Sequence, residues 1–139
     1  EKKENGMFSD YNVNILGFIQ PDKLFDLLIT STLYIHTAYI ENSPNSICEA
    51  QCLGVPIVST NVGGISTLVR NGIDGVLVPA NDPWQMANVI LELSANQLLM
   101  KEYSIKGQSA ARMRHNPKKI LNQLINCYNA IVKENDAVA

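Results

Sequence analysis

The sequence lacks the charge excess and the long apolar runs that mark several classes of protein. Its 139 residues include 11 Lys and Arg against 13 Asp and Glu, which gives a formal net charge of -2. A weakly acidic surface attracts neither nucleic acid nor an anionic membrane, so we expect no nucleic-acid partner. No apolar run approaches the roughly 20 residues that a transmembrane helix needs, and we expect no transmembrane segment.

Cysteines are few and are not spaced as metal ligands. Cys48 and Cys52 stand one helical turn apart rather than at a C-x-x-C spacing, and Cys127 lies far along the chain. Zinc would require further Cys or His residues nearby, so we interpret Cys48 and Cys52 as packing residues. Unpaired thiols are typical of reducing compartments, and the sequence predicts a cytoplasmic protein.

The first residues lack both an initiator methionine and a charged-then-apolar leader. Residues 1–6 are polar and lead directly into an apolar segment. We therefore expect residues 1–139 to be a single, N-terminally truncated domain of a longer protein. With 46% hydrophobic residues the chain can bury one continuous core.

Short apolar segments alternate with helix-like segments along the first half of the chain. The apolar segments predict strands at 13–17, 33–35, 56–59 and 75–78. Helices are expected after Pro21, over 44–53 with Gly54 closing it, and over 65–70. This alternation predicts the α/β class, with a Rossmann-like open parallel sheet covered by helices on both faces.

The last third of the chain predicts helices only. Asp82-Pro83 and Asn116-Pro117 each place a capping residue before a proline suited to the first helical position. A more polar helix is expected between them, over 97–114. Ligands of open parallel sheets bind at the carboxyl ends of the strands, so the loops that follow the predicted strands are the candidate site.

Lys and Arg are absent from residues 27–69, where Glu41 and Glu49 are the only charged residues. Ionised carboxylates only accept hydrogen bonds, so two of them at a cleft suit a ligand rich in hydroxyl groups. Between them, Ser43, Pro44, Asn45 and Ser46 are typical of a helix start, whose free backbone N–H groups bind anions. The pattern predicts a site for a nucleoside-diphosphate sugar.

A purely structural interpretation of the same residues stays open. Ser46 and Glu49 have the spacing of a capping box, in which Glu49 would bond the first amides of its own helix. Glu41 could equally be a solvated loop residue. Spacing alone does not separate these alternatives.

Residues 41–64 carry a family resemblance. Glu41 and Glu49 are separated by seven residues, and Ala50, Gly54-Val55-Pro56, an apolar strand and Val62-Gly63-Gly64 follow in order. This segment resembles the E-x7-E signature of the retaining, GT-B-fold glycosyltransferases of family four. Residues 15–18 and 71–78 resemble the flanking strands of the same family, so the likeness covers roughly 13–93.

The resemblance implies a role for each matching residue. Glu41 would be the catalytic carboxylate that faces the donor sugar, and Glu49 would bond the ribose hydroxyls. The remaining donor-binding residues would be Ser43, Asn45, Ser46 and Ile47 at the diphosphate, Gly17, Phe18 and Ile19 near the base, and Gly63 and Gly64 at the cleft floor.

The resemblance also implies an activity for the whole enzyme. It would transfer a sugar, with retention, from a nucleotide-diphosphate sugar to a hydroxyl of a glycan acceptor, with no metal or other cofactor. The acceptor-binding N-terminal domain would be its partner, this fragment would be inactive alone, and peripheral contact with the inner face of a membrane would be compatible with it.

The chain differs from the family pattern at two places. Asn42-Ser43-Pro44-Asn45 occupies the place where the first Glu is commonly followed by Gly-Phe-Gly. The basic pair that the family carries after the first strand of this domain has no counterpart.

Other classes of protein share features of this chain. A GT-B-fold epimerase or phosphorylase shares the fold, and a receiver-like α/β module or a protein-contact domain shares the size. His36 is interpreted as structural and His115 as solvated, while Trp84 and the methionines are expected in the core or at a domain interface. The basic cluster at 112–119 is interpreted as a solvated helix junction.

Overall fold

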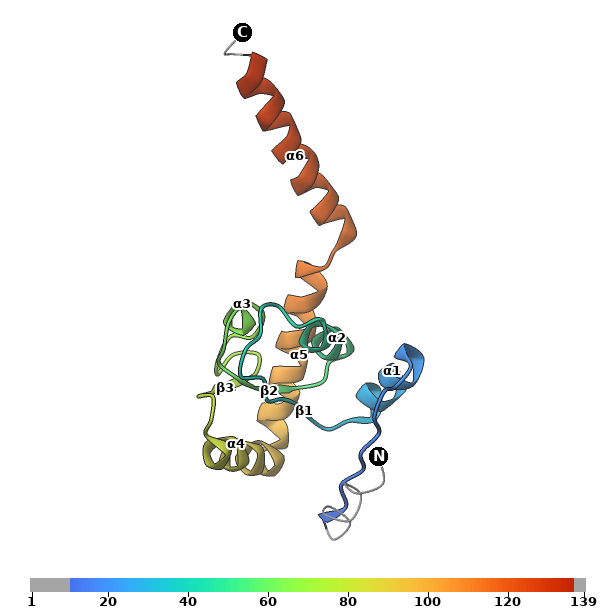
Figure 1. The fold of residues 1–139 in the computed structure, drawn as a ribbon, viewed down its shortest axis with the longest axis vertical. Helices are drawn as coiled ribbons and strands as arrows, with labels where there is room; N and C mark the ends of the chain where they lie inside the picture. Colours follow the sequence, from blue (N-terminus) through green and yellow to red (C-terminus); the bar gives the residue numbers. More distant parts are fainter. Residues whose placement is uncertain (1–10, 137–139) are drawn as a thin grey trace.

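The computed structural model describes residues 11–136 and contains an open sheet of three parallel strands (Figure 1). The strands are β1 (Tyr34–His36), β2 (Ile57–Thr60) and β3 (Val76–Val78), in that order across the sheet. Tyr34 pairs with Ile57, and Val58 pairs with Val76. Because all three strands run in one direction, their carboxyl ends meet at one edge of the sheet.

Helices connect and cover these strands. Within the described residues they are α1 (Pro21–Thr30), α2 (Asn45–Leu53), α3 (Ile65–Leu68), α4 (Pro83–Ala95), α5 (Gln97–Arg114) and α6 (Pro117–Asp136). From α1 onward the order of strands and helices is the predicted alternation, and α5 has the predicted bounds. The fold class is α/β with an open parallel sheet, as the sequence predicts.

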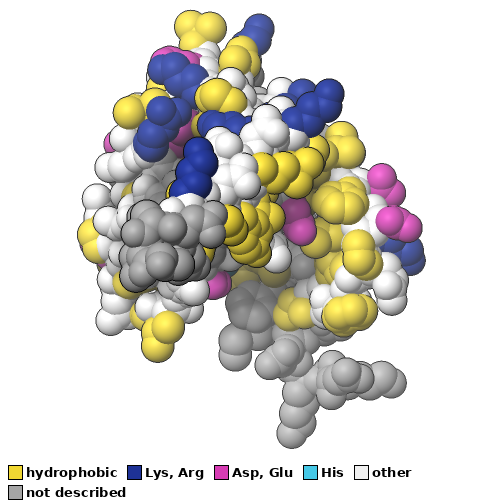
Figure 2. Space-filling view, turned by 90° about the horizontal axis from the view of Figure 1, so that it is seen from above, with side chains coloured by type: hydrophobic (Ala, Val, Ile, Leu, Met, Phe, Trp, Pro, Cys, Tyr) yellow, Lys and Arg dark blue, Asp and Glu magenta, His cyan; other side chains and the backbone are white. Residues whose placement is uncertain are grey.

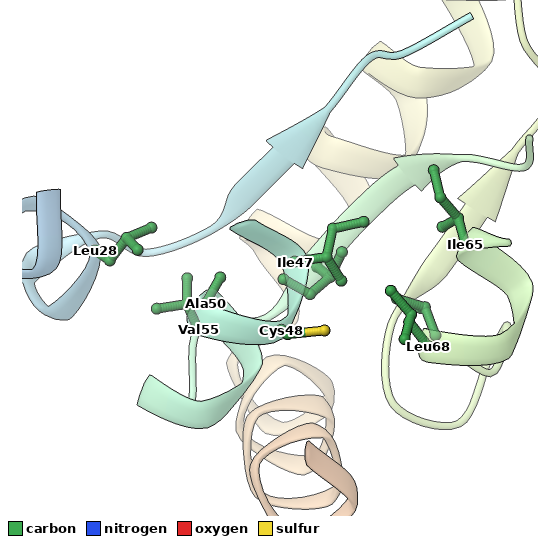
Figure 3. Close-up of a cluster of buried hydrophobic side chains, with 9 residues drawn as sticks. Leu28, Ile47, Cys48, Ala50, Val55, Ile65 and Leu68 are labelled. Carbon is green, nitrogen blue, oxygen red and sulfur yellow. The ribbon is translucent and has the colours of Figure 1, made fainter. Parts of the chain in front are cut away.

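The two faces of the central strand bury two separate clusters of side chains. Ile57 belongs to a cluster with Leu28 of α1, Ile47 of α2 and Ile65 of α3 (Figure 3). Val58, the next residue of β2, belongs to the other cluster, which also holds Val78, Met86, Leu93 and Tyr103. Successive side chains of a strand point to opposite faces, so the sheet is covered on both faces.

Side-chain caps begin the last three helices, as predicted for two of them. In each case an Asp or Asn side-chain oxygen accepts from a backbone N–H three residues later. The caps are Asp82 to Gln85 at 2.9 Å, Asn96 to Leu99 at 3.0 Å and Asn116 to Lys119 at 3.1 Å.

Polar contacts hold α5 against the end of α2. The Ser104 hydroxyl donates to the backbone carbonyl of Gly54 at 2.6 Å, and the Gln108 amide donates to that of Cys52 at 3.3 Å. Arg114 donates to the buried side chain of Gln51 at 2.7 Å. We expected the basic cluster at 112–119 to be solvated. Arg114 departs from this expectation, because it joins α5 to α2.

The predicted strand at 13–17 does not form. Residues 13–17 have no regular secondary structure, and Val13, Ile15 and Leu16 are about half exposed. A strand needs a neighbouring strand to pair with, and within residues 11–136 the sheet ends at β1. The apolar composition of residues 13–17 is thus insufficient to form a strand. Trp84 is 85% exposed and lies outside the core, so of its two expected places only the domain interface stays a prediction.

Helix α6 extends away from the body of the molecule (Figure 1). Its apolar side chains recur at helical spacing and are all exposed: Ile120, Leu121, Leu124, Ile125, Tyr128, Ile131 and Val132. Seen from the α6 end, Lys and Arg side chains gather toward one side and hydrophobic side chains also reach the surface (Figure 2). Among the described residues, no helix is both long enough and apolar enough to cross a membrane.

Candidate functional site

The candidate site lies at the edge of the sheet where the parallel strands end. The loop after β1 carries Glu41 and leads into α2, and the loop after β2 carries Gly63 and Gly64. Ligands of open α/β sheets bind in the crevice at this edge. The structure therefore brings the central part of the predicted site to the expected place.

Glu41 is fixed by groups from its own loop and from β1. Its Oε1 accepts from the backbone N–H of Asn42 at 2.9 Å, and its Oε2 lies 3.6 Å from Nε2 of His36. The Glu41 side chain is 30% exposed, so it remains open to a ligand. It is not the freely solvated loop residue of the alternative interpretation.

Gly63 and Gly64 let the two loops approach backbone to backbone. A Cβ atom on Gly63 would collide with the carbonyl oxygen of Glu41, and one on Gly64 would collide with that of Asn42. Gly63 also has φ +52°, which side-chain-bearing residues rarely adopt. These glycines therefore support the loop that carries Glu41, and their backbone is part of the same site.

Helix α2 begins without any side-chain cap. Pro44 is its N-cap residue and makes no side-chain hydrogen bond to the helix. The first N–H groups of an α-helix have no partner within the helix, so those around Asn45, Ser46 and Ile47 are available to an anion. The Ser46–Glu49 capping box is wrong, because Ser46 lies inside the helix and not at its N-cap.

Glu49 lies on the exposed side of α2 rather than folded back on the helix start. It is half-buried and lines a cleft of about 380 Å³ together with Phe25 of α1, Asn45, Cys48 and His115. No hydrogen bond of its side chain is recorded among the described residues. Its carboxylate is thus free for a ligand. His115 is exposed at the end of α5, as expected, and also borders this cleft.

Gly17, Phe18 and Ile19 lie just before α1. Phe18 and Ile19 line a separate cleft of about 460 Å³ with Leu16 and Gln20. Gly17 has φ +63° and open space where a side chain would stand. The structure therefore groups the predicted base-binding residues with one another but does not place them against Glu41.

Cys48 packs in the hydrophobic core, as the sequence predicts. Cys48 is buried, and burial raises the pKa of its thiol, while Cys127 is exposed. Among the side chains that the structure describes, no group of three His, Cys, Asp or Glu stands close enough to hold a metal ion.

His36 is the site residue that sequence reasoning missed. It ends β1, and its imidazole faces Glu41 across the 3.6 Å gap. The available signal was its place, since the last residue of a parallel strand reaches the edge where ligands bind. Nothing in the sequence showed that the loop after it would return Glu41 to the same point.

Comparison with known proteins gives one family and a consistent set of relatives. A family model described as "Glycosyl transferases group 1" matches residues 2–96. An uncharacterised glycosyltransferase of Methanocaldococcus jannaschii is 25% identical over 132 residues, which is 94% of this chain and 34% of that protein. A D-inositol 3-phosphate glycosyltransferase of Acidothermus cellulolyticus is 29% identical over 119 residues, 86% of this chain and 26% of that protein.

Solved structures share the fold. Sucrose-phosphate synthase of Thermosynechococcus elongatus matches with a TM-score of 0.80 at 23% identity, over 94% of this chain and 34% of that one. HepE of Anabaena in complex with UDP-glucose matches with a TM-score of 0.79 at 23% identity, over 91% and 35%. The C-terminal domain of a group 1 glycosyl transferase (LpcC) of Francisella tularensis matches with a TM-score of 0.66 at 16% identity, over 72% and 52%.

These matches define what part of a protein the chain corresponds to. The chain spans about a third or less of the two curated relatives. Its likeness to an isolated C-terminal domain identifies its fold as that of a C-terminal GT-B domain.

Proposed function

Since the chain belongs to the group 1 glycosyl transferases, we propose that it is the donor-binding half of a two-domain enzyme. The enzyme transfers a sugar, with retention, from a nucleoside-diphosphate sugar to a hydroxyl of a glycan acceptor. One observation carries the proposal: the uncapped start of α2 stands between Glu41 and Glu49, two carboxylates with no Lys or Arg within residues 27–69.

The diphosphate binds at the start of α2. The free N–H groups of Asn45, Ser46 and Ile47, together with the positive end of the helix dipole, hold its negative charge. When the bond to the sugar breaks, charge develops on the departing diphosphate, and preorganised amides stabilise that charge more than the charge of the bound donor. Ser43 lies two residues before the helix and borders the same position.

The two carboxylates bind hydroxyl groups on either side of the diphosphate. Glu49, on the first turns of α2, accepts from the ribose, and Glu41, in the loop before the helix, accepts from the donor sugar. Phe18 and Ile19 line the cleft that receives the base. In the proposed reaction no metal ion takes part.

A second domain completes the enzyme. The apolar stripe of α6 is exposed along the helix, and contiguous exposed apolar surfaces mark sites of contact with other protein. We assign the stripe to contact with the N-terminal, acceptor-binding domain. The fragment alone is then inactive, and its three free thiols favour a cytoplasmic location.

Calorimetric titration with UDP, GDP and ADP tests the proposal. One nucleotide should bind the chain with a Kd of about 0.1–1 mM, and Glu49→Ala should weaken that binding at least about tenfold. Glu92→Ala is the matched control, because Glu92 is exposed on α4 and bonds only Asn88. If a folded chain and the full-length protein both bind none of the three nucleotides, the proposal is wrong.

A further inference from the structure

His36 carries an unsatisfied buried nitrogen that the proposed function has not used. Within the described part of the chain, its Nε2 is the one buried side-chain nitrogen or oxygen with no hydrogen-bond partner. The ring is stacked on Tyr34 with centroids 6.3 Å apart and planes at 26°, and the side chain is 16% exposed. A buried polar group without a partner is costly, so its presence at a ligand-binding edge calls for a reason.

The group nearest to this nitrogen is the Glu41 carboxylate. Nε2 and Oε2 are 3.6 Å apart, just beyond hydrogen-bonding distance. The other carboxylate oxygen, Oε1, already accepts from the backbone N–H of Asn42 at 2.9 Å. A small rotation of the Glu41 side chain would therefore satisfy both Oε2 and the imidazole without loss of the bond to Asn42.

The loop that carries Glu41 limits how far this carboxylate can move. Gly63 and Gly64 lie in backbone contact with Glu41 and Asn42, and their lack of side chains allows the close approach. The carboxylate therefore stays at the sheet edge, and mainly its orientation can vary. The two groups that face its oxygens, the Asn42 amide and the His36 imidazole, determine this orientation.

We propose that His36 is a positioning residue for Glu41, donating from Nε2 to Oε2 when a donor sugar occupies the site. This inference rests on the proposed function, in which Glu41 receives hydroxyl groups of the sugar. With one donor on each oxygen, the plane of the carboxylate is fixed and the remaining lone pairs point at the sugar. Hydrogen bonds of this kind are often long in the free protein and shorten in the complex.

A positioning role for His36 has a distinct consequence for binding. The imidazole acts on the sugar through Glu41, whereas the nucleotide is held by Glu49 and the start of α2. Loss of the donor at Nε2 should therefore weaken the binding of a nucleotide sugar and leave the nucleoside diphosphate alone unaffected. If His36 had only a structural role, its substitution would weaken the binding of both ligands.

Two substitutions by amide side chains test whether the hydrogen-bond donor must stand at the position of Nε2. In His36→Gln the side-chain amide nitrogen can stand where Nε2 stands, and in His36→Asn it stands nearer to Nδ1. Both replace the aromatic ring and its stacking on Tyr34, so their effects on stability should be similar. The difference between them reports the donor at Nε2.

The experiment is calorimetric titration of the full-length protein with UDP and UDP-glucose, or with GDP and GDP-mannose or ADP and ADP-glucose where those bind. Wild type should bind the nucleotide sugar more tightly than the nucleotide. His36→Asn should weaken nucleotide-sugar binding about tenfold, with nucleotide binding within about twofold, and His36→Gln should restore most of the loss.

Each other outcome has a definite meaning. If His36→Asn binds both ligands as tightly as wild type does, the positioning role is overturned and the donor site stands. The same holds if both variants lose affinity for the nucleotide and for the nucleotide sugar by the same factor. A wild type that binds the nucleotide but gains nothing from the sugar also overturns it. A wild type that binds none of these ligands overturns the proposed function, and the inference with it.

Discussion

At the scale of single residues, the site depends on a close approach between two loops that only glycine permits. Gly63 and Gly64 stand against the carbonyl groups of Glu41 and Asn42, with no space for a Cβ atom. The position of the Glu41 carboxylate is therefore set by residues some twenty positions later in the chain. Substitution there should affect both stability and the site.

Gly63→Ala should lower the free energy of unfolding by about 2–4 kcal/mol, because the new Cβ meets backbone and φ is positive. Gly72→Ala is the matched control: Gly72 has φ +72° but open space around it, so we expect a loss of about 1 kcal/mol. Urea unfolding of both variants measures the difference. Equal losses would mean that the two loops do not constrain each other.

The three thiols should react at different rates. Burial raises the pKa of Cys48, so at a given pH less of it is the reactive thiolate, and access is also limited. Cys127 is exposed and Cys52 is intermediate. Alkylation with iodoacetamide at pH 8, followed by mass spectrometry, should label Cys127 first and Cys48 last. Labelling of Cys48 in the folded protein as fast as that of Cys127 would contradict this packing.

Most of the residues assigned to the site could be named from the sequence, and their geometry could not. The spacing of Glu41 and Glu49 predicted two carboxylates around a helix start, and the structure has that arrangement. The contact of His36 with Glu41 depends on the path of the intervening loop, which local pattern does not specify. The capping box failed for a similar reason, since Pro44 begins α2 and leaves Ser46 inside the helix.

At the scale of helices and strands, local signals located helices better than strands. Asp82, Asn96 and Asn116 cap helices with their own side chains, so their signals are complete within a few residues. Gly54, at φ +81°, ends α2 by the same local logic. The segment 13–17 has the composition of a strand, but strand formation needs a partner that the described residues do not provide.

Arg114 joins α5 to the rest of the domain and should matter for stability. It donates to Leu68 at 3.1 Å and to the buried Gln51 at 2.7 Å. Arg114→Ala leaves Gln51 with an unsatisfied buried oxygen and should cost about 1–3 kcal/mol.

The control for Arg114 is Arg112→Ala. Arg112 is exposed in the same last turn of α5, and its loss should change stability by less than about 0.5 kcal/mol. Chemical denaturation of the two variants compares them directly. Equal effects would show that the contacts of Arg114 do not hold α5 in place.

At the scale of the whole molecule, the chain has a two-layered core and one helix outside it. The clusters on the two faces of the sheet include residues of helices α1 to α5, and none of the α6 side chains that the structure describes belongs to either cluster. The exposed apolar stripe of α6 is therefore not required by the core. This division agrees with a domain whose last helix serves contact with other protein.

Deletion of residues 117–139 should leave the thermal midpoint of the remaining chain within about 2 °C of the starting value, because α6 buries little against the core. The deleted chain should also self-associate less, since an exposed apolar stripe is removed. Differential scanning calorimetry and sedimentation measure these two effects. A large fall in the midpoint would mean that α6 stabilises the core.

The central claim is that the start of α2, between Glu41 and Glu49, binds a nucleoside-diphosphate sugar. The measurement that tests it most directly is an NMR titration of the isotope-labelled protein with UDP-glucose, GDP-mannose and ADP-glucose, which follows each backbone amide. One of these ligands should cause the largest chemical-shift changes at the backbone amides of Asn45, Ser46 and Ile47, and the next largest at those of Glu41 and Glu49. Shifts confined to other parts of the molecule, or none with a folded protein at millimolar ligand, would contradict the account.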